Sequence, residues 1–184
     1  MKIETNSELE FTQNWWRRCL VDKNKMTSWL QKLQLTEIGG YRDYLEFIQR
    51  WPDMPERTRA IFHNIGTDER KHSDILLELF DSEGIKPEVA SLETMSMYWA
   101  EVNSHITDLE TCCAVNYYGE NLASFRFSVI RQMPETPGII KNVIDLILPD
   151  EQFHTITLKK LAGDGALRKI AMVHQNAKSK LKGM

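Results

Sequence analysis

The sequence predicts an all-α protein in which four long helices form an antiparallel bundle, with a leader helix before them and a tail helix after them. Apolar residues recur every three or four positions along the 184 residues, which is the period of an amphipathic helix. Proline, glycine and capping residues divide this pattern into segments. Two copies of the pattern DExxH lie on the second and the fourth long segment.

Composition is that of an ordinary soluble protein, with 42% hydrophobic and 27% charged residues, and it predicts one domain over residues 1–184. The net charge of −3 offers no basic surface for nucleic acid. No apolar signal segment opens the chain, and charged or polar residues interrupt its most apolar stretch, 139–148. We therefore expect a cytoplasmic protein with neither nucleic-acid nor membrane partners.

A leader helix is expected to begin at Ser7, which can form a capping box with Glu10. Its apolar face would consist of Phe11, Trp15 and Leu20. After a polar break at 22–25, Thr27 would cap the first long helix, 28–51, which Pro52 stops. The apolar face of this helix would consist of Leu30, Leu33, Ile38, Tyr41, Leu45 and Ile48.

Two glycines, Gly39 and Gly40, lie inside this first long helix, where each costs roughly 1 kcal/mol relative to alanine. We expect them to mark a close helix approach or a local kink beside a functional residue. A simple break of the helix at this point is the alternative.

The second long helix is expected to open at a capping box, Asp53 to Glu56, with Pro55 in its first turn, and to stop at Gly84. A crossover at 85–91 would lead into a helical region from roughly residue 92 to 133, of which 92–104 could belong to the crossover. The buried stripe of the second helix would consist of Phe62, Ile65, Glu69, His72 and Leu76.

The fourth long helix would start at Thr136-Pro137 and close at Gly163 to Gly165, with a kink at Pro149. A basic tail helix, 166–180, would follow as a solvated packing element. Three lysines near its end suit the helix dipole: Lys178, Lys180 and Lys182. Histidines off the DExxH stripes are expected to be ordinary polar positions: His63, His105 and His174.

Each DExxH copy places a glutamate and a histidine three residues apart, so that both point from the same face of a helix. The first copy offers Glu69 and His72, and the second offers Glu151 and His154. These side chains lie in the middle of apolar stripes, where burying a bare carboxylate would be costly. Coordination of a metal ion would compensate that cost.

Each copy is preceded at nearly the same distance by another glutamate on the helix before it. Thirty residues separate Glu37 from Asp68, and twenty-nine separate Glu120 from Asp150. Glu46 competes with Glu37, but it lies only 23 positions before Glu69, whereas Glu37 lies 32 before it. The second pair, Glu120 and Glu151, is 31 apart, which favours Glu37.

In these six residues, over about residues 28–162, the chain resembles the ferritin-like di-iron carboxylate superfamily, which includes ferritins, rubrerythrins and di-iron oxygenases. The resemblance implies an up-down bundle with a long connection between its second and third helices. It also implies that Glu69 and Glu151 bridge two metal ions while Glu37, Glu120, His72 and His154 each bind one. Asp68 and Asp150 would hydrogen-bond the ligating histidines.

Oxygen and nitrogen donors without thiolate favour two iron ions, with manganese also possible. The three cysteines, Cys19, Cys112 and Cys113, form no CxxC pair, so the rubredoxin-type iron site that accompanies rubrerythrins is not expected. The residues before the two histidines, Lys71 and Phe153, depart from the arginine of several superfamily members. That departure argues against any one oxygenase branch.

From this resemblance we favour an enzyme, an oxygen-activating di-iron oxidoreductase that hydroxylates, oxidises or desaturates a small organic substrate. A ferroxidase or peroxidase of ferritin or rubrerythrin type is the first alternative. A metal-binding interaction protein without enzymatic activity is the second. Expected partners are the substrate, dioxygen or peroxide, an electron donor, and a second copy of the chain in a homodimer.

The face of the third helix that carries Glu120 suggests where an organic substrate would lie. This wall would consist of Cys113, Tyr117, Ser124 and Phe127. Tyr117 and Cys113 are the candidate catalytic residues, and Tyr41 with Tyr44 could form a second wall. Plain core packing is the alternative, because aromatic stripes at helical spacing usually belong to the core.

Overall fold

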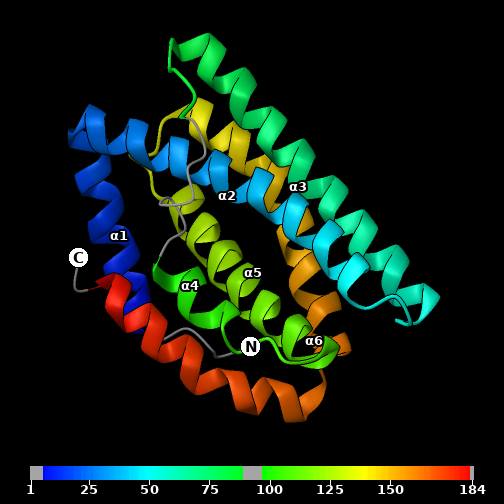
Figure 1. Ribbon diagram of the computed structural model, residues 1–184. Helices are drawn as coiled ribbons and strands as arrows, with labels where there is room; N and C mark the ends of the chain where they lie inside the picture. Colours follow the sequence, from blue (N-terminus) through cyan, green and yellow to red (C-terminus); the bar gives the residue numbers. More distant parts are fainter. Residues whose placement is uncertain (1–5, 89–96, 183–184) are drawn as a thin grey trace. The chain divides into compact units, whose positions relative to one another are not determined.

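The computed structural model describes residues 6–88 and 97–182, and within them it contains six helices and no strand (Figure 1). The helices are α1 (Asn6–Val21), α2 (Lys23–Arg50), α3 (Glu56–Glu83), α4 (Met97–Asn103), α5 (Leu109–Gln132) and α6 (Gly138–Lys182). The all-α prediction is confirmed. No helix in these ranges is both long and apolar enough to cross a membrane.

The chain divides into two compact units, which we describe separately. The hairpin unit consists of Thr12–Ser91 and Val129–Ile147, so α2 and α3 form most of it. The tail unit consists of Met1–Phe11, Leu92–Ser128 and Leu148–Met184, which include most of α5 and the second part of α6.

In the hairpin unit, α2 and α3 run antiparallel as an αα-hairpin (Figure 1). Contacts between them pair later residues of α2 with earlier residues of α3. Gln34 Nε2 donates to Ser73 Oγ at 2.9 Å, and two turns or more along, the rings of Tyr44 and Phe62 meet edge to face at 5.3 Å. This register brings the middle of each helix against the middle of the other.

The ends of this hairpin agree with the sequence in part. Pro52 follows the end of α2, and Gly84 closes α3 in the left-handed conformation, at φ 65°, as expected. The capping box at Asp53 is wrong, because Pro55 itself occupies the N-cap of α3 without a side-chain hydrogen bond. Asp53 therefore lies too far upstream to reach the first free N–H groups.

The junction between α1 and α2 is shorter than predicted. Asp22 alone separates the two helices, and its Oδ1 accepts from the backbone N–H groups of Asn24 and Lys25. The helix therefore begins at Lys23 and not after Thr27. A carboxylate that satisfies two first-turn donors can start a helix five residues before a threonine cap would.

The buried faces of α1 and α2 are rotated relative to the predicted ones. In α1 the buried residues are Glu8, Thr12, Trp16 and Cys19, and not Phe11, Trp15 and Leu20. In α2 they are Leu30, Gln34, Glu37, Tyr44 and Phe47, whereas Leu33, Ile38, Tyr41, Leu45 and Ile48 are half-buried or exposed. The prediction placed the buried face of each helix from its apolar residues alone. It was wrong because each helix also buries polar residues, which pair with residues on other helices.

The tail unit opens α5 with a reciprocal cap. Asp108 Oδ1 accepts from the Thr111 N–H at 2.7 Å, and the Asp108 N–H donates to Thr111 Oγ1 at 3.0 Å. This cap divides the helical region expected from residue 92 to 133 into α4 and α5. Of the predicted crossover, 85–91, residues 85–88 form no helix, whereas 89–91 lie outside the described residues, as do 92–96.

Helix α6 contains two predicted helices in succession. Gly163 adopts φ 67° and ψ 164°, which are not helical angles, so the fourth long helix ends there and the tail helix begins, as predicted. Pro149 lies inside the helical part before it, and the kink expected there stays a prediction. In the tail helix, His174 is fully buried, in contrast to the ordinary polar position expected for it.

His174 is buried because three elements of the tail unit meet at its ring. Its Nδ1 is hydrogen-bonded to the hydroxyl of Tyr98 on α4 at 2.8 Å. Its ring stacks on Tyr118 of α5, with centroids 4.7 Å apart. The Tyr118 hydroxyl in turn donates to the Leu167 carbonyl, so the tail helix is fixed to α5 at two points.

A buried charge cluster fixes the first turns of α1 in the tail unit. Arg126 donates from Nε and Nη2 to Glu8 Oε1 at 3.1 and 2.9 Å, and Lys178 Nζ lies 3.9 Å from Glu8 Oε2. The side chains of Glu8 and Lys178 are 0% and 5% exposed. Lys178 therefore is not the solvated residue that the sequence suggested.

We predict that Glu8→Ala lowers the free energy of unfolding by about 3–5 kcal/mol, because it leaves a lysine and an arginine without their buried counter-charge. Glu10→Ala, an exposed change on the same helix, is the control and should cost much less. Urea unfolding of both variants measures the difference. Equal losses would show that the cluster contributes no more than a surface ion pair.

Candidate metal centre

The hairpin unit contains a cluster of two carboxylates and an imidazole, which we call the hairpin half-site. It consists of Glu37 on α2 with Glu69 and His72 on α3, and these residues are 4%, 7% and 0% exposed. One ligand atom from each lies within 4.8 Å of the others. His72 Nδ1 and Glu37 Oε2 are 3.3 Å apart.

The tail unit contains an equivalent cluster, the tail half-site. It consists of Glu120 on α5 with Glu151 and His154 on α6, and its ligand atoms again lie within 4.8 Å of one another. His154 is fully buried, Glu151 is 2% exposed and the Glu120 side chain 12%. His154 Nδ1 lies 3.9 Å from Glu120 Oε2.

The two half-sites share one geometry, in which histidine Nδ1 faces the carboxylate from the preceding helix. Adjacent ligands around a metal ion with bonds of 2.0–2.2 Å lie about 3 Å apart, close to the 3.3 Å of the hairpin half-site. The 3.9 Å separation in the tail half-site is too long for a hydrogen bond. The 3.3 Å contact is itself a hydrogen bond, and both arrangements are compatible with ligation of a common ion.

Burial of these acids favours a cation at each half-site. Two carboxylates within 4.8 Å of each other repel, and removing them from water weakens the solvation that would offset the repulsion. A neutral imidazole adds a donor but no positive charge. A divalent ion bound by these oxygen and nitrogen atoms would supply the missing charge, and such donors suit iron or manganese.

The position of Glu46 excludes it as the metal ligand from α2 in place of Glu37. Glu46 is exposed, whereas Glu37 is buried beside His72. The histidine and glutamate positions predicted from the two DExxH copies thus lie together within each unit. Asp68 and Asp150 are half-buried, and their proposed hydrogen bonds to the histidines stay a prediction.

A polar contact that the sequence reasoning missed lies beside the hairpin half-site. Gln34, one turn before Glu37, is buried and donates to Ser73, the residue after His72. The bond joins α2 to α3 next to the ligands and so holds the two helices in the register that the half-site needs. Its only signal in the sequence is the spacing of Gln34 from Glu37, one helical turn.

Gly40 provides space for one of the ligands. A β-carbon at position 40 would lie 3.0 Å from Glu69 Oε2 and 3.2 Å from Glu69 Cγ, whereas at Gly39 it would meet nothing within 4 Å. Since α2 continues through both glycines, the predicted close approach is confirmed at Gly40 and the helix break is wrong. Gly40 therefore lets the Glu69 carboxylate lie against the backbone of α2.

The expected wall on α5 is largely buried. Cys113, Tyr117 and Phe127 are 1%, 2% and 4% exposed, and Ser124 is half-buried. Burial, with a smaller contribution from the charge of Glu110, raises the pKa of Cys113 to about 12, so its sulfur remains a thiol. A catalytic role for Cys113 or Tyr117 stays a prediction.

Comparison with known proteins identifies the family. The family model described as rubrerythrin matches residues 31–162, a range that contains all six residues of the two half-sites. No curated protein and no solved structure matched the chain.

We predict that Gly40→Ala weakens metal binding about 10-fold or more, because the new methyl group displaces the Glu69 carboxylate. Gly39→Ala is the matched control, since it adds the same methyl group where nothing lies within 4 Å. It should leave metal binding unchanged and stabilise α2 by about 1 kcal/mol. Anaerobic titration with ferrous iron, together with thermal unfolding, tests both; equal affinities would remove the role given to Gly40.

Proposed function

Because the chain belongs to the rubrerythrin family, we propose that its two half-sites join in one di-iron centre and that the protein is an oxidoreductase that reduces peroxide. The observation that carries the proposal is the pair of equivalent half-sites, each with two acids and an imidazole. Ferritin-like di-iron proteins combine one glutamate from each of two helices with a Glu-x-x-His motif from each of the other two.

In this proposal each residue keeps the role implied by the sequence. Glu69 and Glu151 would be shared between the two ions, Glu37 and Glu120 would each hold one, and His72 and His154 would each add a nitrogen ligand, with their Nδ1 atoms facing those acids. When bound, the iron pair supplies two electrons, and with two protons these convert hydrogen peroxide into two water molecules. Low exposure of the ligands keeps bulk water from competing for the ions.

The electrons would have to come from a donor outside this chain. Rubredoxin-type iron requires cysteine pairs, and the three cysteines here form no CxxC pair. All three are buried and none forms a disulfide, and burial in apolar surroundings disfavours the thiolate that a metal ligand requires. We therefore infer that an external one-electron donor returns the centre to its reduced state.

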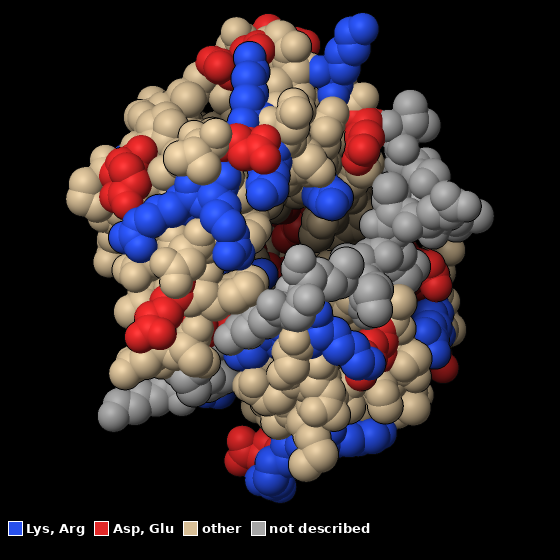
Figure 2. Space-filling view, turned by 90° about the vertical axis from the view of Figure 1, so that its left-hand side faces the viewer, with Lys and Arg blue, Asp and Glu red and all other residues tan. Residues whose placement is uncertain are grey.

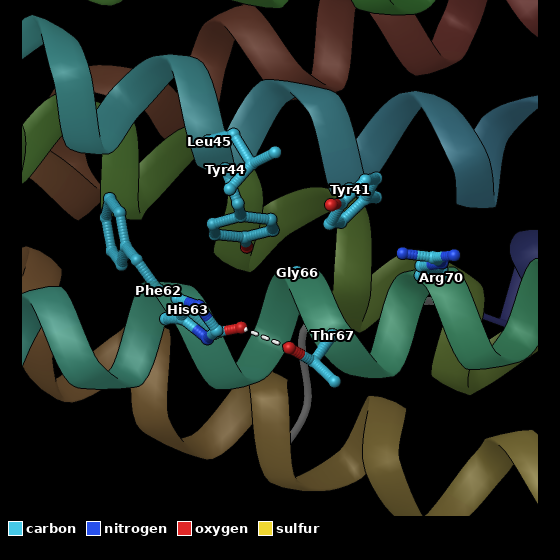
Figure 3. A pocket seen from close by; sticks show the side chains of 8 residues that line it. All are labelled: Tyr41, Tyr44, Leu45, Phe62, His63, Gly66, Thr67 and Arg70. Atoms are coloured by element: carbon cyan, nitrogen blue, oxygen red, sulfur yellow. Dashed lines mark hydrogen bonds between the residues drawn. The ribbon is translucent and has the colours of Figure 1, made fainter.

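A second candidate is the reaction favoured from the sequence alone, oxygen activation on a small organic substrate. The observation in its favour is a cavity of about 200 Å³ in the hairpin unit, lined in part by Tyr41 and Tyr44, which were expected to form a second wall (Figure 3). None of the six ligands lines this cavity, so it supports the second candidate less than the half-sites support the first.

We predict that each chain binds two iron ions and that Glu69→Ala or Glu151→Ala abolishes this, because each removes a shared bridge. Glu46→Ala, an exposed change on α2, should keep both ions. Metal analysis of the purified proteins measures the stoichiometry. One ion per chain in the parent, or two ions in either bridge variant, would contradict the di-iron centre.

We expect hydrogen peroxide to reoxidise the ferrous protein faster than dioxygen does at equal concentration. Stopped-flow absorbance of the anaerobically reduced protein measures both rates, and Glu120→Ala, which removes a ligand, should slow both. Faster reoxidation by dioxygen, accompanied by oxidation of an added organic compound, would favour the second candidate over peroxide reduction.

A further inference from the structure

A cavity of about 200 Å³ lies between α2 and α3 in the hairpin unit, apart from the metal ligands (Figure 3). Gly66 lies at its edge, at a point where α2 and α3 approach closely, since a β-carbon there would lie 3.2 Å from Tyr44 Cβ. The residues that line it are Tyr41, Tyr44, Leu45, Phe62, His63, Gly66, Thr67 and Arg70. We call it the hairpin cavity.

The inner part of the hairpin cavity is aromatic. Tyr44 and Phe62 are 2% and 0% exposed, and their rings meet edge to face at 5.3 Å. Gly66, one turn after Phe62, is buried, and a β-carbon there would lie 3.2 Å from Tyr44 Cβ, so close packing of α2 on α3 leaves these rings little freedom to move. Such a rigid surface favours a flat apolar group.

The outer part carries polar groups that face the same space. Arg70 and His63 are exposed at the two ends of the cavity, and Tyr41 lies beside Arg70, whose guanidinium stands 5.7 Å from the Tyr41 ring (Figure 3). Within the described part of the chain, Arg70 forms no ion pair and the His63 ring forms no hydrogen bond. The rim thus offers donors that no acidic residue occupies.

From this arrangement we propose that the hairpin cavity binds a small aromatic carboxylate of about the size of benzoate. A cavity of about 150 Å³ is enough to hold benzene, so 200 Å³ accommodates one ring with a small substituent. Arginine presents a planar fork that matches a carboxylate, and the resulting charge-assisted hydrogen bonds are stronger than neutral ones.

Other small ligands match the cavity less well. An inorganic anion would pair with Arg70 but would make no apolar contact with Tyr41 or Leu45, the less buried apolar residues of the lining. A neutral aromatic molecule would make the apolar contacts but would form no ion pair with the Arg70 guanidinium. The inference concerns binding alone and does not depend on the reaction proposed above.

Titration of the full-length protein with benzoate, followed by calorimetry or ligand-observed NMR, tests this site. We expect saturable binding, with weaker binding of benzamide, which lacks the charge, and of acetate, which lacks the ring. Arg70→Gln should weaken benzoate binding about 10- to 100-fold. Arg57→Gln, an exposed change of the same charge on the same helix, should not.

A second variant tests the location independently of charge. Leu45 is 37% exposed at the cavity, so Leu45→Trp can fill it from the rim without removing a core side chain, and it should abolish benzoate binding. Absence of saturable binding to the parent, equal losses in Arg70→Gln and Arg57→Gln, or full binding by a folded Leu45→Trp variant would each overturn the site. Iron stoichiometry, measured in parallel, keeps this result separate from the proposed function.

Discussion

The burial of acidic side chains is the constraint on which the rest of this structure depends. Each half-site brings two glutamates and a histidine within 4.8 Å of one another inside the protein, where water cannot solvate the charges. A sequence that tolerates this cost needs a compensating cation, and the donor atoms of both half-sites suit iron or manganese. Burial therefore connects the fold directly to metal chemistry.

The cost of burying a carboxylate is offset in a different way at Glu8. There the counter-charges belong to the protein, since Arg126 and Lys178 approach the two oxygens of a fully buried carboxylate. In the half-sites the neighbouring donor is an imidazole, which binds a metal ion well and carries no charge when neutral. A buried acid beside arginine and lysine therefore indicates a structural ion cluster, whereas buried acids beside a histidine indicate a candidate metal site.

Precise helix positions matter because a metal site tolerates little displacement of its ligands. Around the hairpin half-site, the Gln34–Ser73 hydrogen bond sets the register of α2 and α3, and Gly40 leaves room for Glu69. On the surface, by contrast, positive and negative side chains intermingle on the face shown in Figure 2. Among its described residues, that face carries no large patch of a single charge, in contrast to the buried clusters of acids inside both units.

The sequence by itself determined the helical class, most helix ends and the six candidate ligands, because these depend on local rules. A Glu-x-x-His pair shares a face through helix geometry alone, and two nearly equal spacings identified Glu37 and Glu120. The tertiary structure alone decided which polar residues are buried. Gln34, Lys178 and His174 lie inside because their partners, Ser73, Glu8 and Tyr98, are distant in the chain, and no local pattern records such pairings.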